Sequence, residues 1–290
     1  MMSKLLDLSE KLDSTSITLF ETLSEVTGSL GIPFFVMGAT ARDMIFELGY
    51  GRPSRRATYD RDLGVCVASW AEFENLKKQI FTSGHFKPTH DIHRIRYRGD
   101  LDVDILPFGG IAGTGEEICW PPDKAIVMSV AGFAEAFRAA LTVRVKAIPP
   151  LDVLVASPPG LAILKLISWS DRPHERSRDA LDLAYILENY LDAGNNERLY
   201  EEHMDLVEVE RFDYLGAGAR LLGRDLARIG QPKTMRRIEE ILKREISDGG
   251  QHLLIQGMTP TGTLFEGERE GRSDELLALL QQFKKGVEDR

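Results

Sequence analysis

Two aspartates, Asp60 and Asp62, stand one residue apart in the stretch TYDRDLGV (58–65). Apolar residues alternate through and after this stretch, which is typical of a strand with one buried face. The two carboxylates would share the other face, about 6.5–7 Å apart, where Gly64 is expected to leave room beside them. Like charges repel there unless a cation is present, and oxygen ligands of this kind favour Mg²⁺ or Mn²⁺. Paired aspartates also occur at ordinary strand ends, so the metal interpretation depends on the neighbouring segments.

A second pair of aspartates lies in LDVDILPFG (101–109), where Asp102 and Asp104 share one face of another predicted strand. A third carboxylate on a neighbouring strand completes the minimum set that holds two metal ions about 3.5–4 Å apart for in-line phosphoryl chemistry. Alternation does not distinguish the two residues, because both side chains point the same way. Both remain candidates on the residue pattern alone.

The segment FFVMG (34–38) predicts a short buried strand that runs through Gly38 into a helix over 39–49. Such a turn brings backbone N–H groups and the positive end of a helix dipole to one place. That place suits a phosphate group.

Further charged residues lie on two predicted helices that begin after residue 157. Lys165 and Arg172 are spaced i and i+7, with Trp169 between them, so one helix face is expected to present two cations. Cations there could neutralise triphosphate oxygens as charge develops on departing pyrophosphate. On the next helix Asp179 and Asp182 share a face. The alternative for Lys165 is a surface lysine whose stem lies along apolar neighbours.

The elements that must position these residues divide the chain into two halves. We expect an α+β fold with a mixed β-sheet and flanking helices over 1–157, followed by an α-helical region over 158–290 that completes the cleft. The sheet is predicted from strands at 34–38, 61–67, 93–99, 101–109, 141–148 and 151–157, and the first half also has helices near 19–30, 70–81 and 131–140. Residues 110–130 are expected to form a loop, and 250–272 a surface connection before a final helix.

Composition limits the function classes. The chain has 290 residues and a net charge of −9, which argues against a protein whose whole surface binds nucleic acid. Local basic stretches at 52–62, 90–99 and 171–179 remain candidates, or are simply solvated surface. Cys66 and Cys119 lack the spacing of a disulfide framework or a zinc site. The first thirty residues resemble neither a signal peptide nor a membrane span, so we expect a cytoplasmic protein without membrane contact.

Taken in order, the short motifs resemble a known family. They are G-A-T-A-R-D (38–43), R-A-T-Y-D-R-D (56–62) and V-D-I-L-P-F-G-G (103–110), followed in the helical half by GLAILKLISWSDRPHERSRDALDLAYIL (160–187). This order resembles the minimal nucleotidyltransferases of the polymerase β superfamily, and more specifically the AbiEii group, toxins of type IV toxin–antitoxin systems. The resemblance spans about residues 30–190. One departure is Ala39, which stands where the superfamily usually has Gly or Ser.

The resemblance implies a metal-dependent nucleotidyltransferase that moves a nucleoside monophosphate from an NTP to an acceptor hydroxyl. It favours Asp104 over Asp102, through the match to V-D-I-L-P-F, and it implies an Mg²⁺ or Mn²⁺ site. The implied metal ligands are Asp60, Asp62 and Asp104; the implied catalytic residues are these three with Lys165 and Asp179; and the implied nucleotide-binding residues are Gly38, Thr40, Arg42, Arg56, Lys165 and Arg172.

The implied partners are an NTP, an RNA acceptor, with the 3′ end of tRNA favoured, and an antitoxin protein. Arginines at 52, 55, 56, 94, 96 and 98 are the candidate RNA track. A small-molecule or protein acceptor stays open, as does a catalytically silent relative that binds only a nucleotide or a partner.

Overall fold

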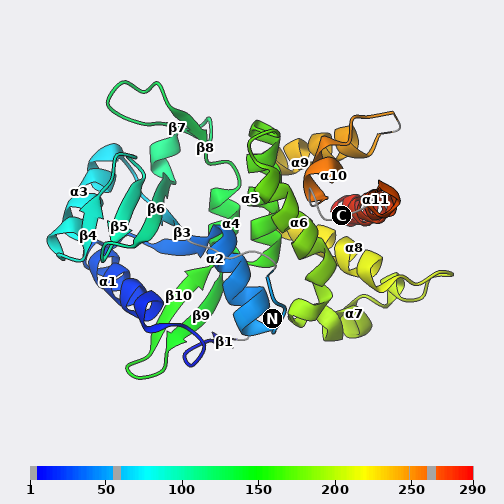
Figure 1. Cartoon of the computed structure of the whole chain (residues 1–290), viewed down its shortest axis with the longest axis horizontal. Coiled ribbons are helices and arrows are strands. Elements are labelled where there is room, and N and C mark those ends of the chain that lie inside the picture. Colours follow the sequence, from blue (N-terminus) through cyan, green and yellow to red (C-terminus); the bar gives the residue numbers. More distant parts are fainter. Residues whose placement is uncertain (1–4, 55–59, 248, 260–265, 290) are drawn as a thin grey trace. The chain divides into compact units, whose positions relative to one another are not determined.

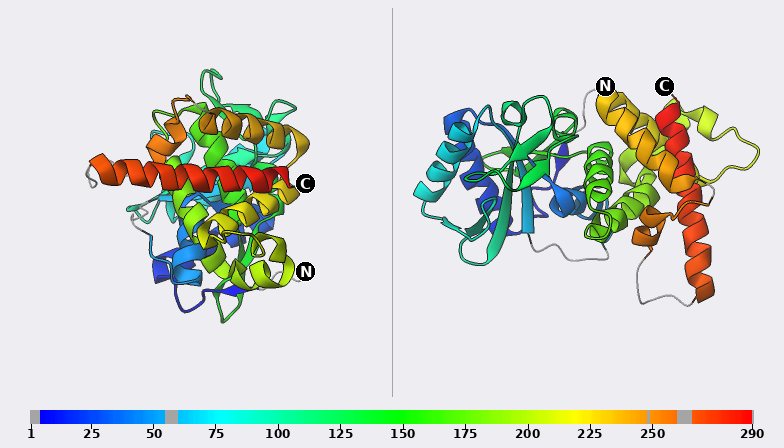
Figure 2. Two further views of the ribbon diagram at one scale, coloured as in Figure 1. Left: turned by 90° about the vertical axis from the view of Figure 1, so that its right-hand side faces the viewer. Right: turned by 90° about the horizontal axis from the view of Figure 1, so that it is seen from above.

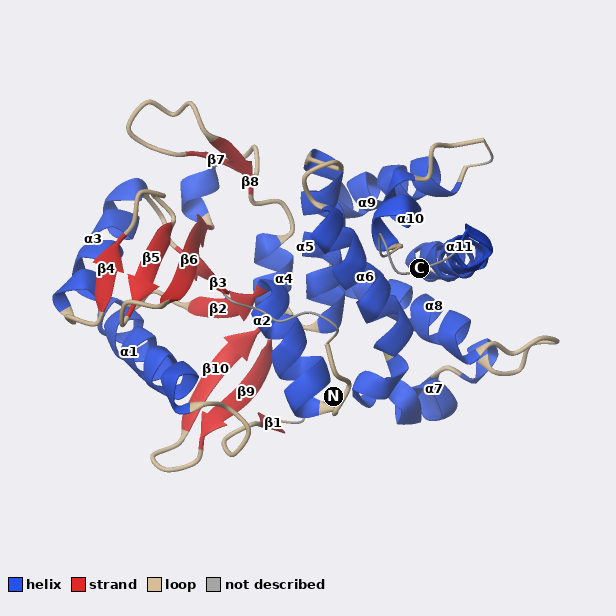
Figure 3. Cartoon of the chain, viewed as in Figure 1, coloured by secondary structure: helices blue, strands red, loops and turns tan. Residues whose placement is uncertain are grey.

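The computed structural model describes residues 5–54, 60–247, 249–259 and 266–289, and the chain divides into two compact units, 1–157 (unit 1) and 158–290 (unit 2). Figure 3 shows strands in unit 1 and helices joined by loops in unit 2. The predicted fold class is therefore confirmed: a large mixed sheet with helices precedes a helical half.

Unit 1 is built on an eight-stranded mixed sheet (Figure 1). In spatial order its strands are β1 (Leu6–Asp7), β9 (Leu141–Lys146), β10 (Leu151–Val155), β2 (Phe34–Met37), β3 (Asp60–Cys66), β6 (Leu101–Phe108), β5 (Arg94–Tyr97) and β4 (Phe86–Pro88). β3 lies between β2 and β6, antiparallel to β2 and parallel to β6. The strands predicted from alternation are confirmed, whereas β1 and β4 are additional.

A separate ribbon pairs β7 (Glu117–Cys119) with β8 (Val127–Ser129), within the segment expected to be a loop. That expectation was wrong for these residues. Ile118 is buried, and the Trp120 ring packs against Trp70 at 5.3 Å between centroids. These apolar contacts stabilise an ordered ribbon despite the glycines and prolines around it.

The helices of unit 1 follow the predicted signals, except for a short turn at 110–112 in the segment expected to be a loop. They are α1 (Ser14–Leu30), α2 (Gly38–Arg42), the π-helical η1 (Asp43–Gly49), α3 (Trp70–Thr82), the 3₁₀ turn η2 (Gly110–Ala112) and α4 (Phe133–Arg138). Asp13 caps α1 by accepting a hydrogen bond from the backbone N–H of Ser16 at 2.8 Å, and Gly31 ends the helix in the left-handed conformation. α2 follows β2 without a loop, so Gly38 stands where strand becomes helix.

An aromatic cluster supports this part of the sheet. The ring of Phe35 on β2 contacts Phe108 of β6 and Phe137 of α4, with centroids 5.6 Å apart in both pairs. Phe35 and Phe108 are fully or almost fully buried. Their packing fixes β2 and β6 on either side of β3.

Unit 2 consists of α5 (Pro158–Asp171), α6 (Ser177–Asn189), η3 (Leu191–Asn195), α7 (Asn196–Glu202), η4 (Met204–Leu206), α8 (Tyr214–Ile229), α9 (Pro232–Ile246), α10 (Leu253–Met258) and α11 (Glu266–Glu288). α5 packs on α6, and the long α11 packs along α8 (Figure 2).

The surface connection expected over 250–272 instead contains α10 and the start of α11. Leu254, Ile255 and Met258 of α10 are buried, so apolar burial accounts for a helix in a segment rich in glycine. Residues 260–265 lie outside the described part of the chain. Among the described residues, no helix has the length and apolar character that crossing a membrane requires.

Candidate active site

Three carboxylates meet on one face of β3 and β6. Asp60 and Asp62 come from β3 and Asp104 from β6, and one oxygen of each lies within 4.8 Å of the others. Strand register explains this meeting, because Asp62 pairs directly with Asp104 across the parallel strands. Asp104 is only 8% exposed, while the other two are partly exposed. A sheet therefore fixes the spacing of these oxygens, with one buried end and one open end.

Asp102, the alternative third carboxylate, lies elsewhere in the register. It pairs with Asp60 across the strands, and its Oδ1 accepts a hydrogen bond from Nε of Arg96 at 2.8 Å. The group of three with converging oxygens contains Asp104 instead. The structure thus separates two residues that strand alternation left equivalent.

Gly38 lies directly against the cluster. Its φ is +64°, and a Cβ added there would lie 1.9 Å from Oδ2 of Asp62. Met37, the preceding residue, pairs with Asp62 across β2 and β3. A side chain at position 38 would displace the carboxylate, so the glycine is needed for the shape of the site as well as for the backbone turn.

Gly64 has a different role from the one expected. A Cβ at this position would lie 2.2 Å from Cε1 of Phe35, its cross-strand partner on β2. The space at Gly64 is therefore filled by an aromatic ring. The expectation of open room beside the aspartates was wrong, because it ignored the side chain on the neighbouring strand.

Thr40 and Arg42, expected to contact phosphate, are both buried. The Thr40 hydroxyl donates to the backbone carbonyl of Asp60 at 3.0 Å. The Arg42 guanidinium donates to Asp43 Oδ1 at 2.6 and 2.8 Å and to the Ser54 hydroxyl at 2.7 Å. In this structure these two residues tie α2 to β3 and to the residues that follow η1. Arg56 lies outside the described residues.

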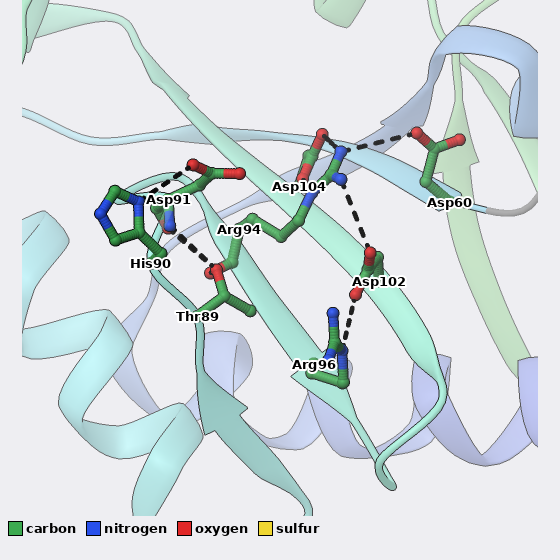
Figure 4. A network of polar contacts seen from close by, with 8 residues as sticks. All are labelled: Asp60, Thr89, His90, Asp91, Arg94, Arg96, Asp102 and Asp104. Carbon is green, nitrogen blue, oxygen red and sulfur yellow. Dashed lines mark hydrogen bonds and ion pairs between the residues drawn. The ribbon is translucent and has the colours of Figure 1, made fainter.

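An arginine that the sequence reasoning did not place in the site faces the cluster. Arg94 of β5 pairs with Asp104 of β6 and forms two hydrogen bonds with its carboxylate, at 2.7 and 2.8 Å. The guanidinium also lies 3.5 Å from Asp102 and 3.7 Å from Asp60 (Figure 4). Hydrogen bonding to Asp104 raises the pKa of Arg94. The signal was available, since a Gly99–Asp100 turn sets a register that brings position 94 opposite 104.

In unit 2, Lys165 is buried on α5, and its ammonium lies between two carboxylates of α6. Nζ is 2.8 Å from Asp179 Oδ1 and 2.7 Å from Asp182 Oδ2. Burial by itself lowers the pKa of an ammonium group, but the negative charges of Asp182 and Asp179 outweigh it, so the pKa of Lys165 is raised. The alternative of a surface lysine was wrong. The predicted shared face of Asp179 and Asp182 is the face that holds this lysine.

Arg172 is not on the same helix as Lys165. α5 ends at Asp171, and the Arg172 side chain is half exposed, 3.7 Å from Glu175. Pro173 explains the end, because the residue before a proline disfavours the helical conformation. The prediction that both cations lie on one helix face was therefore wrong, because the helix ends before Arg172. Trp169, which lies between the two cations in the sequence, is buried.

Comparison with known families identifies the family of the chain. The family model described as nucleotidyl transferase AbiEii toxin, type IV toxin–antitoxin system, matches residues 22–252. The chain belongs to the AbiEii family. This match extends from α1 to the residue before α10. It therefore includes the carboxylate cluster and Lys165 with its two aspartate partners. The prediction of an AbiEii-like nucleotidyltransferase is confirmed at the level of the family.

More distant similarity is found among solved structures. A CCA-adding enzyme in complex with CTP is 18% identical, with a TM-score of 0.34, covering 91% of this chain and 56% of that one. The Thermotoga maritima CCA-adding enzyme in complex with tRNA is 17% identical, with a TM-score of 0.34, covering 91% of this chain and 57% of that one. The AbiEii-family chain thus spans little more than half the length of these proteins. No curated protein matches it.

The carboxylate cluster of this AbiEii-family chain fits a divalent cation. Its donors are three carboxylates whose oxygens already converge, and Mg²⁺ and Mn²⁺ prefer such hard oxygen ligands. Several carboxylates in one place carry a charge that needs a cation, and Arg94 supplies one in this structure. The residues that would hold a metal are therefore Asp60, Asp62 and Asp104.

Proposed function

We propose that this chain transfers a nucleoside monophosphate from an NTP to an acceptor hydroxyl and releases pyrophosphate. The observation that carries the proposal is the convergence of Asp60, Asp62 and Asp104 on adjacent parallel strands, in a chain of the AbiEii family. The cofactor would be Mg²⁺ or Mn²⁺ held by these three carboxylates. When bound, the metal would supply positive charge against the phosphate oxygens of the reacting NTP.

The chain's own residues divide the work. We assign Asp60 and Asp62 to cation binding, and Asp104 both to cation binding and to acceptance of the proton from the acceptor hydroxyl. Gly38 and Thr40 border the cluster at the start of α2, where we place the phosphates. Arg42 supports that turn in this structure, and its contact with phosphate stays a prediction, as do those of Arg56 and Arg172.

The family resemblance supports Lys165 and Asp179 as catalytic residues and Lys165 as a phosphate ligand, and these roles stay predictions, because both residues lie in unit 2. Asp179 and Asp182 hold the ammonium of Lys165 in its charged form. We infer that Asp179 acts by fixing this charge.

The acceptor we propose is RNA, with the 3′ end of tRNA as the first candidate. The resemblance to the toxin group implies an RNA target. Of the arginines expected in the RNA track, Arg52, Arg96 and Arg98 are exposed in unit 1, Arg94 is paired with Asp104, and residues 55 and 56 lie outside the described part of the chain. Phosphate binding by such cations is independent of sequence and sensitive to salt. The reaction would take place in the cytoplasm, where NTPs and tRNA occur, and an antitoxin protein would be its partner.

The proposal is tested by incubating the purified protein with each α-labelled NTP, Mg²⁺ and total tRNA, and by following label into RNA. We expect transfer by the wild type and a loss of at least about 100-fold in Asp62→Asn, because removal of one ligand charge removes most of the cation's hold. Asp152→Asn is the matched control. Asp152 of β10 pairs with Arg144 of β9, and both strands lie beyond β2 from β3 in the strand order.

Label transfer that persists in Asp62→Asn would contradict the assignment. NTP binding without transfer to RNA, small molecules or protein would instead indicate a catalytically silent relative.

A further inference from the structure

The guanidinium of Arg94 contacts the carboxylate cluster directly. The β5–β6 register places it opposite Asp104, and its planar fork covers both carboxylate oxygens at 2.7 and 2.8 Å. Asp60, a second member of the cluster, lies 3.7 Å from the same guanidinium. Figure 4 shows the side chain directed toward both. One arginine therefore contacts two of the three carboxylates assigned to metal binding.

The backbone of Arg94 is fixed, whereas its side chain is only partly covered. Its N–H donates to the carbonyl of Asp91 at 3.0 Å, and its carbonyl accepts a hydrogen bond from the Thr89 hydroxyl at 2.8 Å. The side chain is 28% exposed. Movement of the guanidinium away from Asp104 thus requires rotation of a long side chain at a partly open position, with no change in the sheet.

A divalent cation and this guanidinium need the same oxygens. Mg²⁺ binds carboxylate oxygen at about 2.0–2.1 Å and demands defined geometry, while the fork of Arg94 occupies both oxygens of Asp104. Two cations a few ångströms apart also repel each other strongly in a partly buried site. Simultaneous occupation of Asp104 by both is therefore unfavourable.

We propose that Arg94 is a built-in competitor of the metal: it neutralises Asp104 and Asp60, and it leaves Asp104 when a divalent cation binds. The inference rests on the proposed function, because the metal is the one assigned to nucleotidyl transfer. Its consequence is that the three carboxylates bind metal more weakly than they would without Arg94.

Arg96 offers a matched control. It lies on the same strand and pairs with Asp102 at 2.8 Å, and Asp102 is outside the cluster of three. Replacing either arginine with glutamine removes one positive charge from the same strand. Only Arg94→Gln also releases the oxygens of Asp104. The difference between the two variants therefore isolates direct competition from a change in local charge.

The experiment is a titration of the full-length protein with Mn²⁺ alone, in which free Mn²⁺ is followed by electron paramagnetic resonance. We expect the Kd for Mn²⁺ to fall at least about tenfold in Arg94→Gln and less than about threefold in Arg96→Gln, since only the first removes a direct competitor. Equal or weaker binding by Arg94→Gln, or an equal gain in both variants, would overturn the inference.

Two further variants keep the result interpretable. Arg94→Lys retains the charge without the fork, so we expect Mn²⁺ binding tighter than wild type and weaker than Arg94→Gln. If circular dichroism shows that Arg94→Gln does not fold, the test rests on Arg94→Lys. Mn²⁺ affinity no higher in Arg94→Lys than in the wild type would then overturn the inference. Asp62→Asn is then added to whichever Arg94 variant binds Mn²⁺ more tightly, and this addition should abolish the gain in Mn²⁺ affinity. A gain that persists would mean that Mn²⁺ binds outside the cluster, and it would overturn the inference.

The readout uses neither NTP nor acceptor. Tighter Mn²⁺ binding in Arg94→Gln, together with no nucleotidyl transfer by the wild type, would therefore overturn the proposed function. The inference that Arg94 competes with the metal would still hold.

Discussion

Asp62 and Asp104 face each other across β3 and β6, so the hydrogen-bond register of two central strands sets the distance between them. A site built on strands is held more accurately than one built on loops. The cost is a concentration of negative charge, which Arg94 offsets in this structure.

The first prediction concerns Gly38→Ala. The added Cβ would lie 1.9 Å from Oδ2 of Asp62, at a φ of +64° that disfavours alanine. We expect the free energy of unfolding to fall by about 1–3 kcal/mol and Mn²⁺ affinity to fall at least about tenfold. Urea denaturation and Mn²⁺ titration measure the two effects. Gly28→Ala is the control, because nothing lies within 4 Å of its added Cβ. Unchanged Mn²⁺ binding in Gly38→Ala would contradict this description of the turn.

A second prediction concerns the buried ion pair of unit 2. Lys165→Met leaves Asp179 and Asp182 buried without their ammonium partner. We expect a loss of about 3–5 kcal/mol in the free energy of unfolding, measured by urea denaturation. Lys146→Met, which removes a surface pair with Glu21, should cost less than about 1 kcal/mol. Similar losses in both variants would mean that burial of the Lys165 pair has no energetic weight.

The same pair predicts a pH dependence. Folding raises the pKa of Lys165, so the protonated lysine contributes stability that is complete below the pKa of the unfolded chain and is lost as pH rises through the folded pKa. The relevant quantity is the difference in unfolding free energy between wild type and Lys165→Met at pH 9 and above. It should narrow above about pH 10.4, the ordinary lysine pKa. A difference that stays unchanged above that pH would argue against this origin.

β2 and β3 pack closely where Gly64 of β3 pairs with Phe35 of β2, because the absence of a side chain at position 64 leaves space for the ring. Gly64→Ala would bring Cβ within 2.2 Å of that ring, and we expect a loss of about 1–3 kcal/mol from overpacking. Gly64→Ala combined with Phe35→Leu should be less destabilised than the sum of the single variants. Urea denaturation of all four proteins measures the coupling, and additivity within about 0.5 kcal/mol would contradict the contact.

The sequence predicted the elements that carry a strong period or stop signal. β3, β6 and α1 follow directly from alternation, helical spacing and Gly31. It did not predict contacts that depend on neighbouring strands, because the partner of each residue is set by register. Arg94 opposite Asp104 and Phe35 opposite Gly64 are both of this kind.

Burial explains the other differences. Lys165 has the spacing of a surface residue, and only the packing of α5 on α6 places it between two carboxylates. α10 and the β7–β8 ribbon lie in segments whose glycines suggested loops, yet a few buried apolar side chains in each are sufficient for regular structure. Composition averaged over a segment does not report such tertiary contacts.

At the scale of the whole molecule, a net charge of −9 requires any RNA contact to be local. We expect tRNA affinity, measured with Asp62→Asn to prevent turnover, to fall with salt with a log–log slope steeper than about −2. Arg98→Gln should reduce the slope by about 1, while Arg144→Gln should not, because Arg144 already pairs with Asp152 away from the arginine-rich strand. Affinity indifferent to salt would favour a small-molecule or protein acceptor.

Nucleotidyl transfer requires attack on the α-phosphate of an NTP. The test supplies the wild-type protein, Mg²⁺ and total tRNA with the same NTP labelled either at the α- or at the γ-phosphate. We predict that the α-label enters the acceptor and that the γ-label appears in pyrophosphate. Entry of the γ-label into the acceptor, or its release as inorganic phosphate without α-label transfer, would contradict nucleotidyl transfer.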